Sequence, residues 1–453
     1  MWAAAAADSA DDNGKDGMKI AFVGCGYVFD IYMRTRWAYP EIEIRGVFDI
    51  DAARAGVVHR HYGIPVYPSM QALLDDAAVE VVVNLTGIDS HEEVTRRALA
   101  AGKHVFTEKP ITTDLAQTRA LFALAAAHGR VLAAAPCNLH SDAVSTVWKA
   151  VSDGAIGRPV LVYAEMDDNP AHLMRMDTVR SPTGAPFPYR EEFEHGCTVE
   201  HVGYHLAWIC ALLGPATGVT AFSKCLVPDK TAEPLNPPDT PDFSVACLDF
   251  AGGASARITC SWVAPRDHSM RIIGDEGQLS VDNAFHDQSP VRLERFSRVS
   301  LTARKAFTLR NQPLIGHRFG VGGARLTLVR RWKSHAVEAE RGVGRSLKHR
   351  LVSWLRRREI YAQDKMLGIA EMGKAIAERR EQPMPPDFLM HLNELTLLIQ
   401  NAGARGRTAV PTTSFAPLPL FPDIAASPRD YRAGYRATRL ERLATRMVER
   451  LHR

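Results

Sequence analysis

Two stretches of the sequence carry side chains that could move a proton or hold a reacting oxygen. The first is Lys103–Pro110, Lys-His-Val-Phe-Thr-Glu-Lys-Pro, which ends a short apolar strand. Because Pro110 restricts the preceding residue to an extended or turn backbone, it holds Lys109 in place at the carboxyl end of that strand. Open α/β sheets bind ligands at this edge, where a fixed lysine could stabilise a developing alkoxide. The alternative is a solvated surface lysine.

The second stretch places His201 and His205 four residues apart. On an α-helix this spacing puts both imidazoles on one face, where they could exchange protons with a substrate near neutral pH. Two zinc ligands would show the same spacing, with His195, Cys197 or Glu200 as a third, and so would two packed core histidines. Glu200 lies about 100° round such a helix from His201, so we expect it to be a poor partner for Lys109.

The elements that would position these side chains begin with an apolar strand at Met18–Val23. The turn Gly24–Phe29, Gly-Cys-Gly-Tyr-Val-Phe, follows it and leads into residues at helical spacing. Gly24 permits a tight turn, and Gly26 lets the backbone approach a pyrophosphate held at the helix N-terminus. Phe29 stands where glycine or alanine normally allows close packing, so we expect it to push the helix outward.

An acidic residue follows the second predicted strand, Glu43–Phe48. Asp49 lies 25 residues after Gly24. A carboxylate there can accept hydrogen bonds from the ribose hydroxyls of adenosine and would repel a 2′-phosphate, which favours NAD over NADP. Arg54 is near enough in sequence to reverse this preference.

Strands and helices alternate with short connections up to about residue 150. This alternation predicts an α/β fold with a doubly wound parallel sheet. Beyond it the strands are short and few helices interrupt them, which predicts an α+β domain with an open, mostly antiparallel sheet. These later strands are expected at 160–166, 219–224, 243–250, 254–262 and 270–273.

Four motifs in this order resemble the Gfo/Idh/MocA oxidoreductases: the Gly24–Gly26 turn, the Thr86–His91 loop, Ala101–Val105 and Glu108–Pro110. The resemblance covers residues 18–285 and returns at 360–402. It implies an N-terminal Rossmann domain that binds NAD or NADP and a homo-oligomer built through the open sheet face. The implied cofactor contacts are Gly24, Gly26, Tyr27, Val28, Asp49, Thr86, His91, Glu108 and Lys109, with Lys109 at the nicotinamide.

The resemblance also implies catalytic roles. Lys109 would orient the substrate oxygen, His205 matches the family histidine and would take the hydroxyl proton, and His201 stands where the family has an aspartate. The predicted reaction is hydride transfer between a nicotinamide and a hydroxyl or keto carbon of a sugar, cyclitol or nucleotide sugar. Two alternatives remain open: an NAD-dependent glycosidase of the same family, and a catalytically idle nucleotide-binding scaffold or sensor. The residue types at His201 and Phe29 support the idle alternative.

The composition limits the cellular compartment and the class of protein that we expect. The 453 residues include seven dispersed cysteines, and no apolar run reaches the length of a membrane span. We therefore expect reduced thiols, no bound metal, and a cytoplasmic protein that is at most peripheral at a membrane. The predicted units are a disordered N-terminus at 1–17, the dinucleotide-binding domain at 18–150, the substrate domain at 151–402, and a proline-rich strap with a basic terminal helix at 403–453.

A basic insertion, at about 286–360, interrupts the substrate domain. Its segment Arg292–Arg358 holds 18 basic and 3 acidic residues in a chain whose net charge is only +4. We expect an appendage that neither completes the sheet nor carries chemistry, because burying so many unpaired charges is costly. The segment could be a solvated face, a contact to an anionic membrane surface or a contact to a subunit. A specific nucleic-acid site is not predicted, since no recognised module is present.

Overall fold

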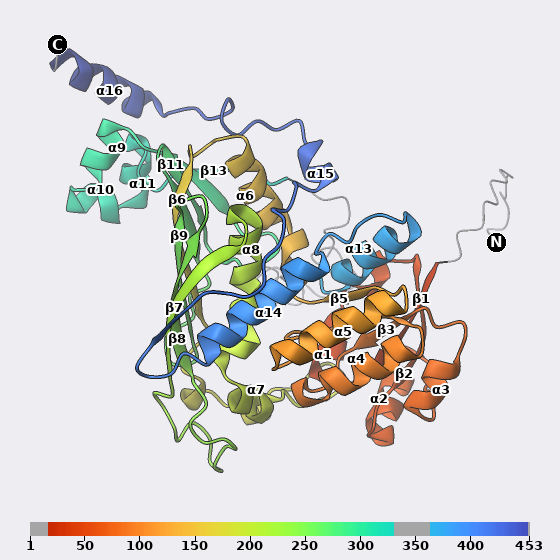
Figure 1. The fold of residues 1–453 in the computed structure, drawn as a ribbon. Coiled ribbons are helices and arrows are strands. Elements are labelled where there is room, and N and C mark those ends of the chain that lie inside the picture. Colours follow the sequence, from red (N-terminus) through yellow and green to blue (C-terminus); the bar gives the residue numbers. More distant parts are fainter. Residues whose placement is uncertain (1–16, 330–362, 452–453) are drawn as a thin grey trace, which may run out of the picture.

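The computed structural model describes residues 17–329 and 363–451, which form two sheets with their helices (Figure 1). The first sheet has five parallel strands in the order β2-β1-β3-β4-β5. Its strands are β1 Met18–Val23, β2 Ile42–Phe48, β3 Val81–Asn84, β4 His104–Thr107 and β5 Leu132–Ala134. Its helices are α1 Tyr27–Met33, α2 Ala52–Tyr62, α3 Met70–Asp75, α4 His91–Ala100 and α5 Leu115–Ala127. The predicted Rossmann sheet is confirmed.

Both faces of this sheet are covered, as the continuous apolar strands require. In β1, Ile20 and Phe22 pack with α1, α2 and α13 (Met366–Ala377), whereas Ala21 and Val23 pack with α3, α4 and α5 on the other face. Phe29 fits into the first of these layers, fully buried, with its ring 5.2 Å from that of Phe22.

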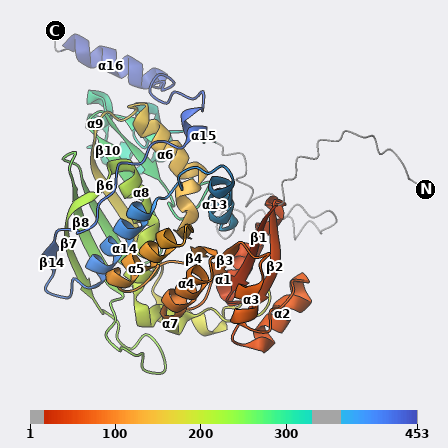
Figure 2. The same ribbon diagram turned by 45° about the vertical axis from the view of Figure 1, so that its right-hand side comes forward.

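The second sheet has nine strands in the order β13-β12-β11-β10-β6-β9-β8-β7-β14. Neighbouring strands are antiparallel except for β6 and β9, so the prediction of a mostly antiparallel sheet is confirmed. The helices α6 Asp142–Ser152, α8 Gly203–Leu213 and α14 Pro386–Gln400 cover one face (Figure 2). Its strands are β6 Pro159–Asp167, β7 Ala216–Lys224, β8 Phe243–Phe250, β9 Ser255–Ser261, β10 Met270–Gly274, β11 Gly277–Val281, β12 Val291–Arg295, β13 Ala324–Arg325 and β14 Arg407–Ala409.

The prediction that the segment starting at Arg292 stays outside the sheet is wrong where the structure describes it. Strand β12 pairs with β11, and β13 pairs with β12. Apolar residues alternate with charged ones in β12, so Leu293 is buried while Arg292 and Arg295 pair with acidic partners on neighbouring loops. Arg292 and Arg295 therefore join the sheet with ion-pair partners, so no unpaired charge is buried at these two positions. The remainder of the segment, from Arg330 to Arg358, lies outside the described residues.

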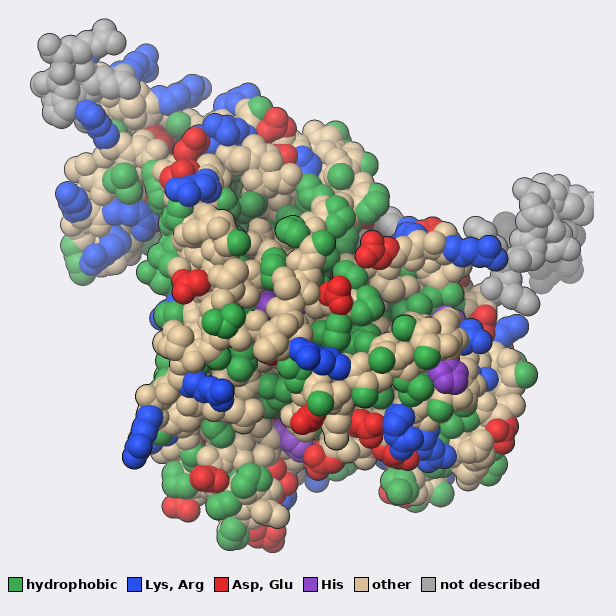
Figure 3. All heavy atoms as spheres, viewed as in Figure 1, with side chains coloured by type: hydrophobic (Ala, Val, Ile, Leu, Met, Phe, Trp, Pro, Cys, Tyr) green, Lys and Arg blue, Asp and Glu red, His purple; other side chains and the backbone are tan. Residues whose placement is uncertain are grey.

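Three short helices between β12 and β13 project from the end of the second sheet: α9 Arg298–Ala303, α10 Phe307–Asn311 and α11 Pro313–Gly316. The terminal helix α16, Arg439–Leu451, contacts α9 and the turn His317–Phe319, so segments more than a hundred residues apart meet here (Figures 1 and 3). Between α14 and α16 the chain runs as the predicted extended strap, broken by β14 and by α15 Pro422–Ala425. Within the described ranges, no helix is both long and apolar enough to cross a membrane.

Candidate active site

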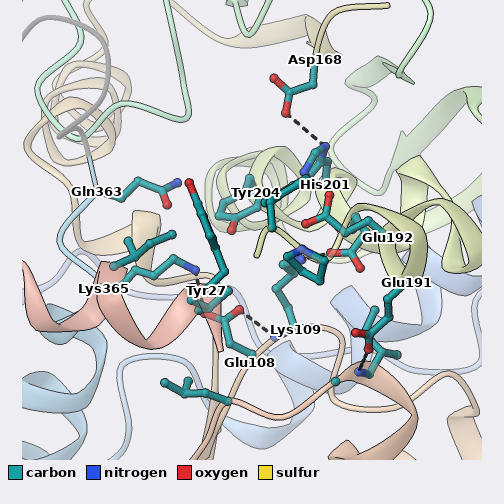
Figure 4. Close-up of a pocket in the computed structure, with 18 of the residues that line it drawn as sticks. Tyr27, Glu108, Lys109, Asp168, Glu191, Glu192, His201, Tyr204, Gln363 and Lys365 are labelled. Atoms are coloured by element: carbon teal, nitrogen blue, oxygen red, sulfur yellow. Dashed lines mark hydrogen bonds and ion pairs between the residues drawn. The ribbon is translucent and has the colours of Figure 1, made fainter. Parts of the chain in front are cut away.

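A cavity of about 400 Å³ lies where loops that follow β1, β3 and β4 meet the second sheet and its helices (Figure 4). Seven of the residues predicted from sequence line it: Tyr27, Val28, Thr86, His91, Glu108, Lys109 and His201. Four others do not: Gly24, Gly26, Asp49 and His205. The second sheet, its helices and the later part of the chain contribute lining residues that include Asp168, Glu191, Glu192, Glu200, Tyr204, Trp262, Arg266, Gln363 and Lys365.

The glycine turn after β1 fits a dinucleotide. Gly24 has φ +94°, and a Cβ atom there would lie 2.6 Å from the Leu85 carbonyl oxygen, so only glycine is accommodated. A Cβ atom on Gly26 would meet nothing within 4 Å, which leaves room beside the turn. The Cys25 amide donates to Asp49 Oδ2 at 2.7 Å, which fixes this carboxylate beside the turn.

Arg54 is engaged elsewhere. Its Nε donates to the Cys25 carbonyl oxygen at 2.6 Å, one terminal nitrogen donates to the Thr183 carbonyl oxygen at 3.0 Å, and the guanidinium lies 3.8 Å from Asp30. Because these contacts hold the guanidinium against the protein, it is not free to bind a 2′-phosphate.

The predicted cofactor residue His91 joins two loops. Its Nδ1 lies 2.7 Å from the Pro110 carbonyl oxygen, and its Nε2 lies 3.1 Å from the Thr86 carbonyl oxygen. Burial lowers the pKa of this imidazole. Since both ring nitrogens face backbone carbonyls, the side chain positions the loops after β3 and β4. Helix α4 begins at His91, and the Ser90 side chain before it makes no capping hydrogen bond.

The expectation that Glu200 is a poor partner for Lys109 is wrong, because their side chains form an ion pair. The segment Thr198–Val202 is a π-helical turn, and its extra residue changes the angular position of each side chain relative to α8. Glu200 from this turn and Tyr204 from α8 both line the cavity. Figure 4 shows Glu108 and Lys365 on one side of Lys109, and Glu192 and His201 on the other.

His205 does not line the cavity, contrary to the prediction. Its side chain is fully buried, and neither ring nitrogen has a hydrogen-bond partner within the described residues. Burial, with the nearby His268, lowers the pKa of His205 to about 3. It is therefore neutral at ordinary pH and is not among the residues that line the cavity.

Charged neighbours keep both groups of the Glu108–Lys109 motif ionised. Burial alone would lower the pKa of Lys109, but Glu200, with Tyr204 and Glu108, raises it above its usual value. Burial would raise the pKa of Glu108, but Lys365 and Lys109 lower it to about 2. Lys365 Nζ lies 2.6 Å from Glu108 Oε1, to which the Tyr32 hydroxyl also donates at 2.9 Å.

Helix α7, Tyr189–His195, brings two further carboxylates to the cavity. Glu191 Oε1 accepts the Ile88 amide at 2.7 Å, which ties α7 to the loop after β3. The Glu192 side chain makes no hydrogen bond or ion pair within the described part of the chain. Burial and the neighbouring Glu200 raise the pKa of Glu192 well above its usual value. Glu192 is thus a carboxyl group available to a ligand.

His201 lies on the opposite wall from Lys365. The Trp262 indole N–H donates to its Nδ1 at 3.3 Å, and Asp168 Oδ2 lies 3.6 Å from the same nitrogen. Burial, despite Asp168, lowers the pKa of His201 to about 4, so the ring is neutral at pH 7. No cluster of three or more His, Cys, Asp or Glu residues suited to a metal occurs in the described ranges.

Two family models match this chain in succession. Residues 18–135 match the oxidoreductase family with an NAD-binding Rossmann fold, and residues 144–280 match the GFO/IDH/MocA C-terminal domain. The chain belongs to the Gfo/Idh/MocA oxidoreductase family. This family membership makes it an oxidoreductase with a nicotinamide cofactor, NAD or NADP, in the first domain.

Relatives of this Gfo/Idh/MocA chain act on several sugar-like compounds. A dTDP-3,4-didehydro-2,6-dideoxy-alpha-D-glucose 3-reductase of Streptomyces violaceoruber is 27% identical over 59% of this chain and 73% of its own length. An inositol 2-dehydrogenase of Acidothermus cellulolyticus is 29% identical over 32% of this chain and 44% of its own length. The WlbA dehydrogenase of Bordetella pertussis, in complex with NADH and UDP-GlcNAcA, is similar in fold, with a TM-score of 0.59 at 15% identity over 84% of this chain and 94% of that one.

Sequence reasoning missed four residues of this Gfo/Idh/MocA site. Glu191 and Glu192 form an acidic pair in sequence, but nothing local connects them with Lys109. Tyr204 was missed because the four-residue spacing of His201 and His205 indicated His205, its neighbour in sequence, as the site residue. Lys365 lies in a stretch that resembles the family, yet its contact with Glu108 spans more than 250 positions and depends on the tertiary fold.

The Glu108–Lys365 pair makes a prediction about stability and pH. The pKa of Glu108 in the fold lies below its usual value, so its ionised form stabilises the native state above about pH 4.5. This contribution is lost as the pH falls towards 2. We expect Glu108→Gln to lower the free energy of unfolding by on the order of 3 kcal/mol at pH 7, and by less at about pH 3.

Urea unfolding across this pH range measures the effect. Glu43→Gln is the control, because Glu43 and its partner Arg45 are exposed and such pairs contribute little. If Glu108→Gln lowers the free energy of unfolding by the same amount at pH 7 and at pH 3, the assigned ionisation of Glu108 is contradicted.

Proposed function

We propose that the protein transfers a hydride between NAD and a hydroxyl or keto carbon of a sugar, cyclitol or nucleotide sugar. The observation that carries this proposal is the shared cavity, which joins the Rossmann loops at Thr86 and Lys109 to acid-base groups of the second domain. A nicotinamide bound at these loops would supply the hydride acceptor or donor. The sugar-like substrates of the relatives support the substrate class.

Each polar group of the cavity has a role in this proposal. Lys109, kept cationic by Glu200, orients the reacting oxygen and stabilises negative charge on it. Tyr204 donates a second hydrogen bond to this oxygen. Glu192 takes the hydroxyl proton during oxidation and returns it during reduction, in place of the buried His205. His201, held by Trp262 and Asp168, shapes the wall beside them.

The cofactor preference is a separate prediction. Asp49 stands beside the glycine turn, and Arg54 is bound to Cys25 and Thr183, so Arg54 does not offset the repulsion between Asp49 and a 2′-phosphate. We expect NAD to bind at least about tenfold more tightly than NADP, which corresponds to about 1.4 kcal/mol. Asp49→Asn should reduce this ratio. Fluorescence titration with both cofactors measures it.

Asp51→Asn is the matched control, because Asp51 caps helix α2 and an amide oxygen can still accept from the Ala53 amide. The ratio of the two affinities should not change in this variant. Tighter binding of NADP by the wild-type protein would overturn the assignment of Asp49.

The activity itself can be tested without knowing the substrate. Purified protein is denatured and the released nucleotide identified, and native protein is then offered a panel of sugars, cyclitols and nucleotide sugars while NADH absorbance is followed. Turnover of one compound class supports the proposal. Glycoside cleavage with retained NAD would indicate the glycosidase alternative, and bound NAD with no turnover of any class would indicate the idle one.

We also propose that the exposed face of the second sheet carries a contact between copies of the chain. Among the described residues, α6, α8 and α14 pack on the opposite face, and partly exposed residues alternate with buried ones along the central strands. On the exposed face Tyr163 lies beneath Arg257 and Arg271, at 5.0 and 5.2 Å from its ring centre. A surface with aromatic and arginine side chains suits a protein interface.

A further inference from the structure

The projecting helices form a compact unit that we name the basic lobe, defined as residues 297–323 and 436–451. Helix α16 packs against α9, and the Thr438 hydroxyl donates to the Arg318 carbonyl oxygen. Glu441 turns inwards and is 4% exposed, in contact with Gly320. Arg304 reaches back to Glu294 of β12, which ties the lobe to the sheet. The lobe is therefore part of the fold.

Large apolar side chains are exposed on this lobe to an unusual degree. Half of the exposed large apolar side chains in the described parts of the chain lie here, within two short segments. Leu314 is 88% exposed and Phe307 is 71% exposed. The others are Leu301, Ile315, Leu440, Leu443 and Met447. Clustered apolar exposure of this kind marks a surface that contacts something other than water.

The same surface is strongly cationic. The lobe sequence holds ten Arg and Lys residues and two Glu residues, and residues 297–323 contain no acidic residue. Arg298, Lys305, Arg310 and Arg318 are exposed and form no ion pair with another described residue. Figure 3 shows Lys and Arg side chains gathered over α9, α10, α11 and α16. Exposed apolar side chains that lie among cations without an ion-pair partner form an amphipathic surface.

We propose that the basic lobe docks on an anionic lipid bilayer. Its cations would lie at the lipid phosphates while Phe307, Leu314 and their apolar neighbours enter the boundary between headgroups and acyl chains. A second copy of the lobe is a poor partner, because two surfaces without acidic residues at 297–323 would repel each other. A nucleic acid would satisfy the cations but would leave the exposed leucines of the lobe in water.

The test uses the full chain and vesicles of phosphatidylcholine with about 30% phosphatidylglycerol, compared with phosphatidylcholine alone. Sedimentation should show binding to the anionic vesicles that weakens by at least about tenfold between about 0.1 and 0.5 M NaCl, because exposed charges are screened. Each cation near the surface contributes about fivefold to binding. Lys305→Gln with Arg310→Gln should therefore weaken it by about 25-fold, and Phe307→Ser with Leu314→Ser should also weaken it.

Matched controls separate a specific surface from general charge and hydrophobicity. Arg60→Gln with Arg405→Gln removes two exposed cations elsewhere, and Leu173→Ser with Val410→Ser removes two apolar side chains that are each 75% exposed. These controls should bind vesicles as the wild type does. NAD affinity should remain unchanged in all four double variants, which shows that they are folded.

Three outcomes would overturn the proposal. The first is the absence of vesicle binding at low salt. The second is equal loss of binding in the lobe variants and the controls. The third is a change of oligomeric state in the lobe variants, measured by sedimentation velocity without lipid, which would assign the surface to a second copy of the chain.

Discussion

Replacing Lys109 with alanine is expected to lower kcat by at least about 100-fold, since positioned proton-transfer and charge-stabilising groups contribute about 10² to 10⁴ to the rate. The ammonium group is kept cationic by Glu200 and lies at the meeting point of the two domains. Lys109→Arg should keep the pairing with Glu200 while displacing the charge, so it should recover stability more than activity.

The measurement is steady-state kinetics with the substrate found in the panel, together with NAD affinity and urea unfolding. Lys224→Ala is the matched control, because Lys224 is an exposed lysine at the end of β7 and should leave kcat unchanged. If Lys109→Ala turns over at nearly the wild-type rate, Lys109 has no part in the chemistry.

Replacing Glu192 with glutamine is expected to lower the rate of oxidation by about 100-fold or more and to change its pH profile. A base must be ionised to accept a proton. Because burial and Glu200 raise the pKa of Glu192, the wild-type rate should increase as the pH rises through this raised pKa. Lys109 opposes the shift, whereas Asp168 and Glu191 add to it.

The variant should lose this pH-dependent increase in kcat/KM, a change that a purely structural role would not produce. Glu194→Gln on the same helix is the control, because Glu194 pairs with Arg190 and does not line the cavity. If kcat/KM of Glu192→Gln still increases with pH as it does in the wild type, another group accepts the proton. His205→Gln would then be the next variant to measure.

The sequence by itself determined the first domain and part of the site. Strand β1 was predicted with its observed bounds, since a continuous apolar run before Gly-x-Gly permits few alternatives. Lys109 was found because its chemistry is local: a strand end, an adjacent glutamate and a proline. The sheet position of β12 was missed, because arginines paired across the fold look in sequence like unpaired charges.

Only the tertiary structure decided which side chains surround Lys109. Sequence spacing assumes a regular α-helix, whereas the segment Thr198–Val202 is a π-helical turn with an extra residue, and its Glu200 pairs with Lys109. Whether this turn is π-helical or α-helical depends on its packing against β9 and α14. The local sequence does not show this packing. Glu192 and Lys365 reach the site from distant elements, so their roles follow from the meeting of two domains and not from neighbours in the chain.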